Sequence, residues 1–287
     1  MILTAEQRSR LEQLALRTRH RVRGRWWGAH RSSRYGDSID FADYRPYSEG
    51  DDIRRVDQHL YARLGVLAVR LFEAEDESPL RLVVDRSASM SIGEKWPTAL
   101  AAAGVLGFLA LASGDRVQAY ATPGGGGRHH DPAPPMRQAA SWPRLEAWLE
   151  GIEPSGVAPL SQAVRGVAGG APGPVVLISD LMDVEWEATL DRLSLGRGGI
   201  VVHVLDQVEL APDLAGDVEL VDVETGRRID VSLDPGVVEA YQGRLDRFLA
   251  ASEERARRRG LDHLLVPAGP DLADRLIADL AGRGVVR

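Results

Sequence analysis

The stretch LRLVVDRSAS, residues 80–89, joins an apolar segment to an alternating run of one acid and two hydroxyls. The apolar part predicts a buried strand, and the polar part begins where that strand ends. The alternation of Asp85, Ser87 and Ser89 is compatible with a turn in which a serine caps the next helix. It is also compatible with half of a metal site, because a carboxylate and two hydroxyls are oxygen ligands that suit Mg²⁺ or Mn²⁺.

The pattern of an apolar strand followed by a helix recurs through the rest of the chain. Further strands are expected at residues 115–121, 174–180, 199–206 and 263–267. Helices are expected at residues 95–113, 142–151, 159–169, 185–194, 235–259 and 270–283. Near-continuous apolar strands that alternate with helices predict an α/β fold, with a mostly parallel sheet covered by helices on both faces. Residues 217–233 predict a β-hairpin, inserted in this pattern and turning at Thr225-Gly226.

Three of the predicted strands end in an aspartate, namely Asp85, Asp180 and Asp206. In parallel α/β sheets, ligands bind at the carboxyl ends of the strands. Three acids at strand ends are more than we expect by chance. We therefore expect Asp85, Ser87, Ser89 and Asp180 to form one site at this edge of the sheet.

Residues 1–79 are expected to form an N-terminal extension of the α/β domain, which we place at residues 80–287. A short helix begins near Thr4 and Gln7, which form a capping-box pattern. Residues 24–79 are irregular apart from a strand-like segment at 66–75, which could not bury itself alone, so we expect this region to pack on the domain. We expect ion pairs among five charged residues of this region, Arg45, Asp51, Asp52, Arg54 and Asp57.

The composition is that of a globular protein, with 44% hydrophobic and 27% charged residues. The absence of cysteine excludes disulfides and thiolate metal sites. The longest apolar run, residues 99–112, is too short to span a bilayer, and the N-terminal residues lack a signal-peptide core. We expect a cytoplasmic protein without a membrane span.

Charge is distributed unevenly, because residues 1–34 carry nine arginines against Glu6 and Glu12 while the whole chain has a net charge of −7. Trp26 and Trp27 lie beside the arginines and could stack on bases. No nucleic-acid motif accompanies this charge, so we expect the arm to pair with its own acidic domain and predict no nucleic-acid partner.

Other catalytic and nucleotide-binding motifs do not occur. There is no P-loop, no G-x-G-x-x-G and no G-x-S-x-G elbow. The run GGGG at residues 124–127 predicts a flexible turn, and the neighbouring His129 and His130 are expected to be solvated. His203 lies within an apolar strand, where a core histidine with satisfied ring nitrogens is the usual case.

A longer motif supplies a family resemblance. Residues 36–58, GDSIDFADYRPYSEGDDIRRVDQ, followed by DRSASM at 85–90, resemble the domain of unknown function 58 family. Its members carry a G-x-x-x-F-x-x-x-R-x-Y-x-x-G-D-D-x-R-x-x-D-W type signature, and Gln58 stands here where tryptophan is usual. The likeness covers about residues 24–287, and it continues through AR at 62–63, FEAE at 72–75, GDRV at 114–117 and VDVETG at 221–226.

The resemblance implies a Rossmann-like von Willebrand factor A fold with a metal-ion-dependent adhesion site, whose ligand pattern matches Asp85, Ser87, Ser89 and Asp180. Such sites also use a threonine from a second loop, typically in GGT-x-L. Here that loop is GVAPL, which places Ala158 at the threonine position. One ligand is therefore missing, and we expect weak binding of Mg²⁺ or Mn²⁺.

Members of this family look like partners of MoxR-type AAA+ ATPases. The resemblance therefore implies that the protein is a bacterial adaptor in the maturation of other proteins. No enzymatic activity is implied. We expect a non-enzymatic binding module whose partners are such an ATPase and its client protein. Two alternatives stay open: a metal-dependent hydrolase that uses the strand-end aspartates, and a scaffold in which the metal site is vestigial.

Overall fold

The computed structural model forms two units, Met1–Gly28 with Ser78–Arg287, and Ala29–Glu77. It describes residues 1–19, 41–48, 51–52, 56–72, 79–123, 131–157, 159–168, 173–195, 198–213 and 216–282. The predicted GGGG turn, His129, His130, Arg54, Ala158 and the two tryptophans of the arm lie outside the described residues.

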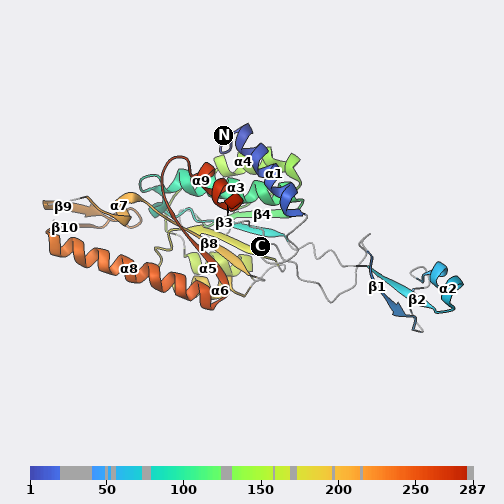
Figure 1. Ribbon diagram of the computed structural model, residues 1–287. Coiled ribbons are helices and arrows are strands. Elements are labelled where there is room, and N and C mark those ends of the chain that lie inside the picture. The colour runs from blue at the N-terminus through green and yellow to red at the C-terminus, as the bar shows by residue number, and fades with distance from the viewer. Residues whose placement is uncertain are drawn as a thin grey trace. The chain divides into compact units, whose positions relative to one another are not determined.

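The larger unit is built on a mostly parallel sheet, in which the predicted neighbours β3, β7 and β8 lie side by side (Figure 1). From one edge, the parallel strands are β11 (Leu261–Pro267), β8 (Gly199–Leu205), β7 (Val175–Ser179), β3 (Leu80–Val84) and β4 (Arg116–Ala121). The short β5 (Asp131–Pro132) and β6 (Met136–Arg137) pair antiparallel with β4. Every residue of β3 and β7 is buried, as their continuous apolar sequences predict.

Helices cover both faces of this sheet, which confirms the α/β class. Because side chains alternate along a strand, Leu82 and Val84 of β3 face one layer and Val83 faces the other. The first layer holds α1 (Ala5–Arg19), α3 (Lys95–Ser113), α4 (Trp142–Glu150) and α9 (Leu272–Gly282). The second layer holds α5 (Leu160–Ala168), α6 (Trp186–Leu193) and α8 (Pro235–Arg258).

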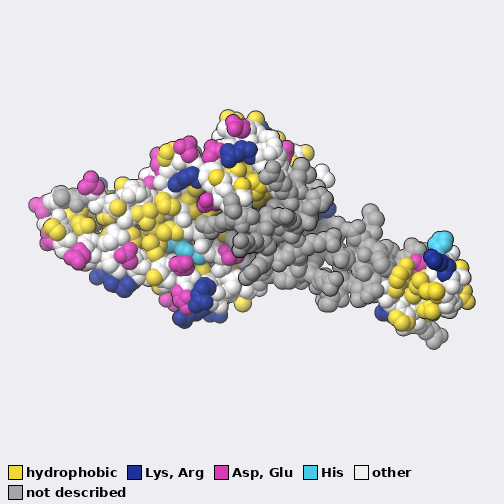
Figure 2. All heavy atoms as spheres, in the orientation of Figure 1, with side chains coloured by type: hydrophobic (Ala, Val, Ile, Leu, Met, Phe, Trp, Pro, Cys, Tyr) yellow, Lys and Arg dark blue, Asp and Glu magenta, His cyan; other side chains and the backbone are white. Residues whose placement is uncertain are grey.

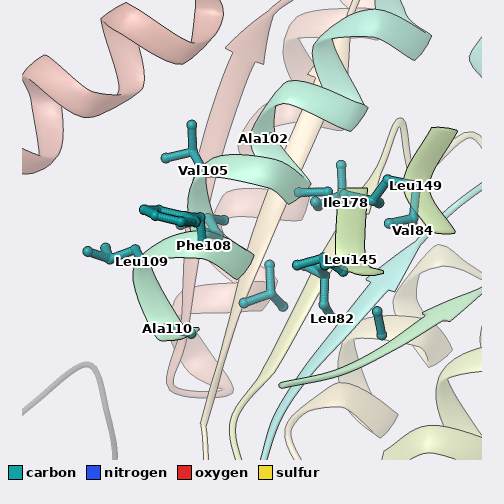
Figure 3. Packing of buried hydrophobic residues seen from close by; sticks show 14 of the residues in the cluster. Leu82, Val84, Ala102, Val105, Phe108, Leu109, Ala110, Leu145, Leu149 and Ile178 are labelled. Carbon is teal, nitrogen blue, oxygen red and sulfur yellow. The ribbon is translucent and has the colours of Figure 1, made fainter. Parts of the chain in front are cut away.

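Helix α3 is the centre of the first layer. Figure 3 shows Phe108 of this helix in one cluster with the sheet residues Leu82 and Ile178 and with Leu145 of α4. Within the described part of the chain, α3 alone is long and apolar enough to cross a membrane, but 67% of its most apolar window is buried inside the protein. Its composition therefore fits the core helix of a globular unit.

Helix α1 belongs to the larger unit, whereas the sequence grouped it with the extension. Its buried residues Leu11 and Ala15 join the same hydrophobic cluster as α3. The predicted capping box is present, because the Gln7 N–H donates to the Thr4 hydroxyl over 3.2 Å and the Thr4 N–H donates to Gln7 Oε1 over 2.9 Å.

A hairpin of β9 (Gly216–Val221) and β10 (Arg228–Leu233) forms a separate two-stranded sheet, as predicted for residues 217–233. Gly226 in its turn has a φ of +69°, a left-handed conformation that favours glycine. Helix α7 (Gln207–Leu210) precedes the hairpin, and α8 follows β10 directly.

The smaller unit pairs β1 (Phe41–Pro46) antiparallel with β2 (Ala68–Phe72). Only β2 was predicted, and the short helix α2 (Gln58–Leu64) was missed, although Asp57 caps it by accepting from His59 N and Leu60 N. Arg45 and Asp51 form the expected ion pair at 2.7 Å. The packing of this unit on the α/β unit stays a prediction.

Candidate functional site

Asp85 leaves the middle of the sheet at its carboxyl edge. Its strand β3 is paired on both sides, so Ser179 at the end of β7 and Thr122 just after β4 flank it. The Ser179 hydroxyl donates to Asp85 Oδ2 over 2.6 Å, and the Thr122 hydroxyl lies 3.3 Å from Oδ1. The Ser87 N–H donates to the same Oδ1 over 3.0 Å. The turn therefore holds the carboxylate in one orientation.

The surroundings of Asp85 disfavour its ionised form. Burial and, next, the nearby charge of Asp180 raise its pKa, hydrogen bonds from Ser179 and Ser87 lower it, and the resulting pKa is about 6. No ion pair to Asp85 is present among the described residues. A buried carboxylate of this kind is stabilised by any positive charge that reaches it.

The two serines do not cap the next helix. Ser87 precedes the short 3₁₀ helix Ala88–Ser91, but its side chain makes no capping hydrogen bond. Its hydroxyl instead lies 2.9 Å from the hydroxyl of Ser89. The alternation of the sequence thus places two hydroxyls side by side next to Asp85, as the binding-site interpretation requires.

The second loop lies against this turn. The Ala88 N–H donates to the Gly156 carbonyl over 2.9 Å, and the Ser155 N–H donates to the Arg86 carbonyl over 2.8 Å. These contacts hold residues 155–157 of the second loop against the turn that carries the serines.

Asp180 forms an ion pair with a lysine side chain of the protein. Its Oδ2 lies 2.8 Å from the ammonium of Lys95, and its Oδ1 accepts from the Met182 N–H over 3.0 Å. Lys95 is completely buried at the start of α3 and also contacts Glu209 Oε1 over 2.7 Å. Burial favours the neutral amine, but the two carboxylates outweigh it and raise the pKa of Lys95. Sequence reasoning missed this residue, although Lys95 is the only lysine of the chain.

Asp206, the third strand-end acid, has a structural task. It caps α7 in a capping box with Glu209, and its Oδ2 accepts from the Glu94 N–H over 2.7 Å. A Cβ on Gly93 would lie 2.1 Å from that oxygen, so only glycine lets the two segments meet. Asp206 thereby fixes the start of α3, which carries Lys95.

His203 is the satisfied core histidine that the sequence predicted. Its Nε2 lies 2.8 Å from the backbone carbonyl of Asp180, and its Nδ1 lies 3.1 Å from Nε2 of His263. Burial, followed by the neighbouring His263, lowers the pKa of His203 to about 4. The ring is therefore neutral at physiological pH and supports the backbone behind Asp180.

Glu224 is a further site residue that the sequence did not indicate. It comes from the β9–β10 turn and is half-buried, whereas its neighbours in the turn are exposed. Burial raises the pKa of Glu224, the nearby Ser89 hydroxyl lowers it, and the charges of Asp180, Asp222 and Asp183 raise it again. The β9–β10 turn therefore lies within electrostatic range of the strand-end site.

Exposed apolar side chains lie in the loops next to these polar groups. Val157 of the second loop is 51% exposed, Met182 after β7 is 45% exposed, and Val184 is fully exposed. Large apolar side chains on flanking loops are typical of a surface that meets another protein.

The donors gathered at the edge are one carboxylate and two hydroxyls, of the kind that a hard divalent cation prefers. The described part of the chain contains no group of three or more His, Cys, Asp or Glu side chains that could hold a metal. Any cation here would therefore depend on the serine hydroxyls, on water and on a further ligand. The raised pKa of Asp85 is consistent with such a need for positive charge.

Comparison with known proteins agrees with the motif pattern. A family model described as "Protein of unknown function DUF58" matches residues 43–248. The uncharacterized proteins Rv1480 of Mycobacterium tuberculosis and Mb1516 of Mycobacterium bovis are each 31% identical over 242 residues, covering 79% of this chain and 74% of theirs.

Two solved structures show a slight likeness. BatB, a conserved hypothetical protein from Bacteroides thetaiotaomicron, has a TM-score of 0.39 at 12% identity, over 71% of this chain and 98% of BatB. The pilus adhesin SpaC from Lactobacillus rhamnosus GG has a TM-score of 0.36 at 12% identity, over 72% of this chain and 30% of SpaC. Likeness at this level carries no argument about function. The family match and the mycobacterial relatives show that this chain belongs to the DUF58 family.

Proposed function

We propose that the protein is a non-enzymatic binding module, of von Willebrand factor A-like architecture, whose strand-end site receives an acidic group of a protein partner. The observation that carries this proposal is the pair of hydroxyls on Ser87 and Ser89, set beside the buried Asp85 and flanked by exposed apolar side chains. Hydroxyls and a bound cation can both receive a carboxylate, and the apolar loops supply the contact area around it.

In this proposal Asp85, Ser87 and Ser89 would hold Mg²⁺ or Mn²⁺. The cation would supply positive charge for the partner's carboxylate. Asp180 is already paired with Lys95, so it would act through its field or through a water rather than as a free ligand. Asp85 is held in place by Ser179 and Thr122. Pre-positioning of this kind lowers the cost of binding.

The proposed partner is a MoxR-type AAA+ ATPase with its client, in the bacterial cytoplasm. Family membership and the motif resemblance support this choice. The partner would place an Asp or Glu side chain on the serines and apolar residues on Val157, Met182 and Val184.

A scaffold with a vestigial metal site is the second candidate, and one specific observation favours it. The ammonium of Lys95 lies 2.8 Å from Asp180 and so provides positive charge at this edge without a metal. In that case a partner would still bind, but independently of divalent cations. The hydrolase alternative is less favoured, because His203, the histidine that contacts Asp180, is buried with both ring nitrogens bonded and is therefore not available as a general base.

The test measures binding of the purified MoxR-type ATPase of the same organism to the immobilised protein, with Mg²⁺ and with a chelator. Val184→Asp should weaken binding about tenfold or more, as charging a residue at the centre of an interface does. Leu195→Asp is the matched control, since Leu195 is 79% exposed at the other end of α6 and should leave binding unchanged.

The polar part of the site is tested by the double variant Ser87→Ala with Ser89→Ala, which should also weaken binding. Cation-dependent binding supports the metal-bearing form, and chelator-insensitive binding supports the scaffold. Equal binding by the wild type, Val184→Asp and the double-serine variant would rule out this site as the contact.

A further inference from the structure

The β9–β10 hairpin has one apolar face. Leu220 lies opposite Ile229 across the two strands, and Val218 lies opposite Val231. Because side chains alternate along a strand, these four residues share one face, and the charged residues between them lie on the other. Leu220 is 42% exposed and Ile229 is 55% exposed, although a two-stranded sheet needs a cover on its apolar face to be stable in water. The structure thus leaves part of an apolar sheet face open to solvent.

Further apolar side chains are exposed in the elements around this pair. They are Val208 of α7, Val223 of the turn, and Val237 and Tyr241 of α8, which lie one helical turn apart on the same side of their helix. Figure 1 places the hairpin and the first part of α8 together at one end of the larger unit, and Figure 2 shows hydrophobic side chains on the surface there. Single exposed apolar residues are ordinary, whereas a group of them is typical of a surface that meets another molecule.

Hydrogen bonds hold these elements in a defined arrangement. The Tyr241 hydroxyl donates to the backbone carbonyl of Glu209 over 2.7 Å, and the Glu209 carboxylate lies 2.7 Å from the ammonium of Lys95. In the turn, the Asp222 carboxylate accepts from the Thr225 hydroxyl over 2.7 Å and from the Thr225 N–H over 3.1 Å. A surface that is ordered before binding loses less entropy when a partner arrives.

The same stretch of chain is strongly acidic. Residues 213–241 contain eight Asp or Glu residues against Arg227 and Arg228, which gives a net charge of −6, and the net charge of the whole chain is −7. Seven of the eight acids are exposed. Figure 2 shows acidic side chains among the hydrophobic ones at this end of the larger unit. Such a charge distribution attracts basic partners and repels acidic ones.

Charge also decides between the possible occupants of this apolar surface. A second copy of the chain would bring an equally acidic region against the first, and like charges that face each other oppose association. Nucleic acids and anionic lipid surfaces are repelled for the same reason. A protein segment that combines apolar residues with Lys or Arg complements both properties of the surface.

We propose that the exposed residues Leu220, Ile229, Val237 and Tyr241, with the acids around them, form a docking surface for a basic amphipathic segment of a partner protein. This hairpin surface includes none of the strand-end serines and aspartates. It therefore gives the protein a second binding surface, which does not depend on the proposed function and selects for the opposite charge.

The probe is a synthetic amphipathic peptide of leucine and lysine at helical spacing, about four turns long and carrying a fluorescent label. Its binding to the full chain is measured by fluorescence anisotropy. One control peptide has glutamate in place of lysine, and the other has glycine in place of leucine. We expect the leucine–lysine peptide to bind about tenfold more tightly than either control, because only this peptide matches both the apolar residues and the charge.

The apolar part of the surface is tested by the double variant Leu220→Thr with Ile229→Thr. Threonine is β-branched and suits a strand, so the hairpin should keep its structure while losing apolar contact area. The affinity for the leucine–lysine peptide should fall about tenfold or more. The matched control is Leu195→Thr with Leu265→Thr, since both leucines are exposed outside the hairpin surface and should leave the affinity unchanged.

The charge is tested by Asp230→Asn with Glu239→Gln, two exposed acids of residues 213–241. Their neutralisation should weaken peptide binding about threefold or more. Glu12→Gln with Asp279→Asn is the control, because it removes two exposed acids from α1 and α9 and should change the affinity little.

Three outcomes overturn the inference. The first is the absence of leucine–lysine peptide binding, and the second is an equal loss of binding in the hairpin variants and their controls, which would indicate non-specific attraction to an acidic protein. The third is a dimer in sedimentation velocity that Leu220→Thr with Ile229→Thr abolishes, which would assign the surface to a second copy. None of these measurements uses the ATPase, so the result is separate from the test of the strand-end site.

Discussion

Replacement of Lys95 by methionine is the sharpest test of how the strand-end site is held together. The substitution keeps a long unbranched side chain and removes only the ammonium. Asp180, which is 1% exposed, then keeps its charge without its partner, close to the charge of Asp85. Glu209 loses its partner as well, but its side chain is 14% exposed and can gain water in exchange.

The size of the effect follows from burial. Breaking a buried ion pair by removing one partner costs about 3–5 kcal/mol, because an uncompensated charge stays inside the protein. Against a typical stability of about 5–15 kcal/mol, Lys95→Met should fold but be markedly less stable. Asp180→Asn should cost less, about 1–3 kcal/mol, because Lys95 keeps Glu209 as its partner.

The assay is urea unfolding at pH 7, followed by circular dichroism and extrapolated to zero denaturant. The double variant Lys95→Met with Asp180→Asn should be more stable than Lys95→Met alone, because the orphaned charge has gone. Asp191→Asn is the control: it removes a partly exposed partner of Arg255, where water screens the pair, and should have a much smaller effect. A Lys95→Met variant as stable as the wild type would refute the claim that this ion pair supports the site.

Three further outcomes are expected. Gly93→Ala should lower the unfolding free energy by about 1–3 kcal/mol, because a Cβ there collides with Asp206 and φ is +55°. Gly243→Ala should instead stabilise the protein by about 0.5–1 kcal/mol, because Gly243 lies inside α8 and a Cβ there would have its nearest contact at 3.6 Å. Thermal unfolding of both variants compares the two effects. The pKa of Asp85 is raised to about 6 from 3.8, so the folded state holds an extra proton between these pH values, and stability should fall as pH rises from about 4 to 6. Urea unfolding across this pH range should show a flatter slope for Asp85→Asn, and an unchanged slope would contradict the raised pKa of Asp85. Calorimetry should find weak Mg²⁺ binding in the wild type, tighter binding in Ala158→Thr and none in Asp85→Ala, and tight wild-type binding that survives Asp85→Ala would rule out this metal site.

The sheet was predictable because the sequences of its central strands indicate burial on both faces. LRLVV and VVLIS each contain one polar residue, Arg81 and Ser179, and such apolar sequences are typical of strands between two helical layers. The missed strand β1, FADYRP, lacks this signal because it contains charges and a proline in a two-stranded ribbon. Helix α2 has seven residues, too few for periodicity to show.

The three strand-end aspartates looked equivalent in sequence, and the structure separates them. Asp206 is followed three residues later by Glu209, a capping-box pattern that local reasoning could have found. Asp85 and Asp180 carry no comparable local signal, and their different surroundings come from other parts of the chain.

Residues close together in the chain predicted most strands and helices of the larger unit, the hairpin, and the carboxylate with two hydroxyls at the end of β3. Contacts between distant segments could not be predicted in this way. Lys95 reaches Asp180 across 85 positions of sequence, and Asp206 meets the Glu94 N–H across 112 positions. Charge pairing and burial act through space, and the folded arrangement of the layers sets those distances.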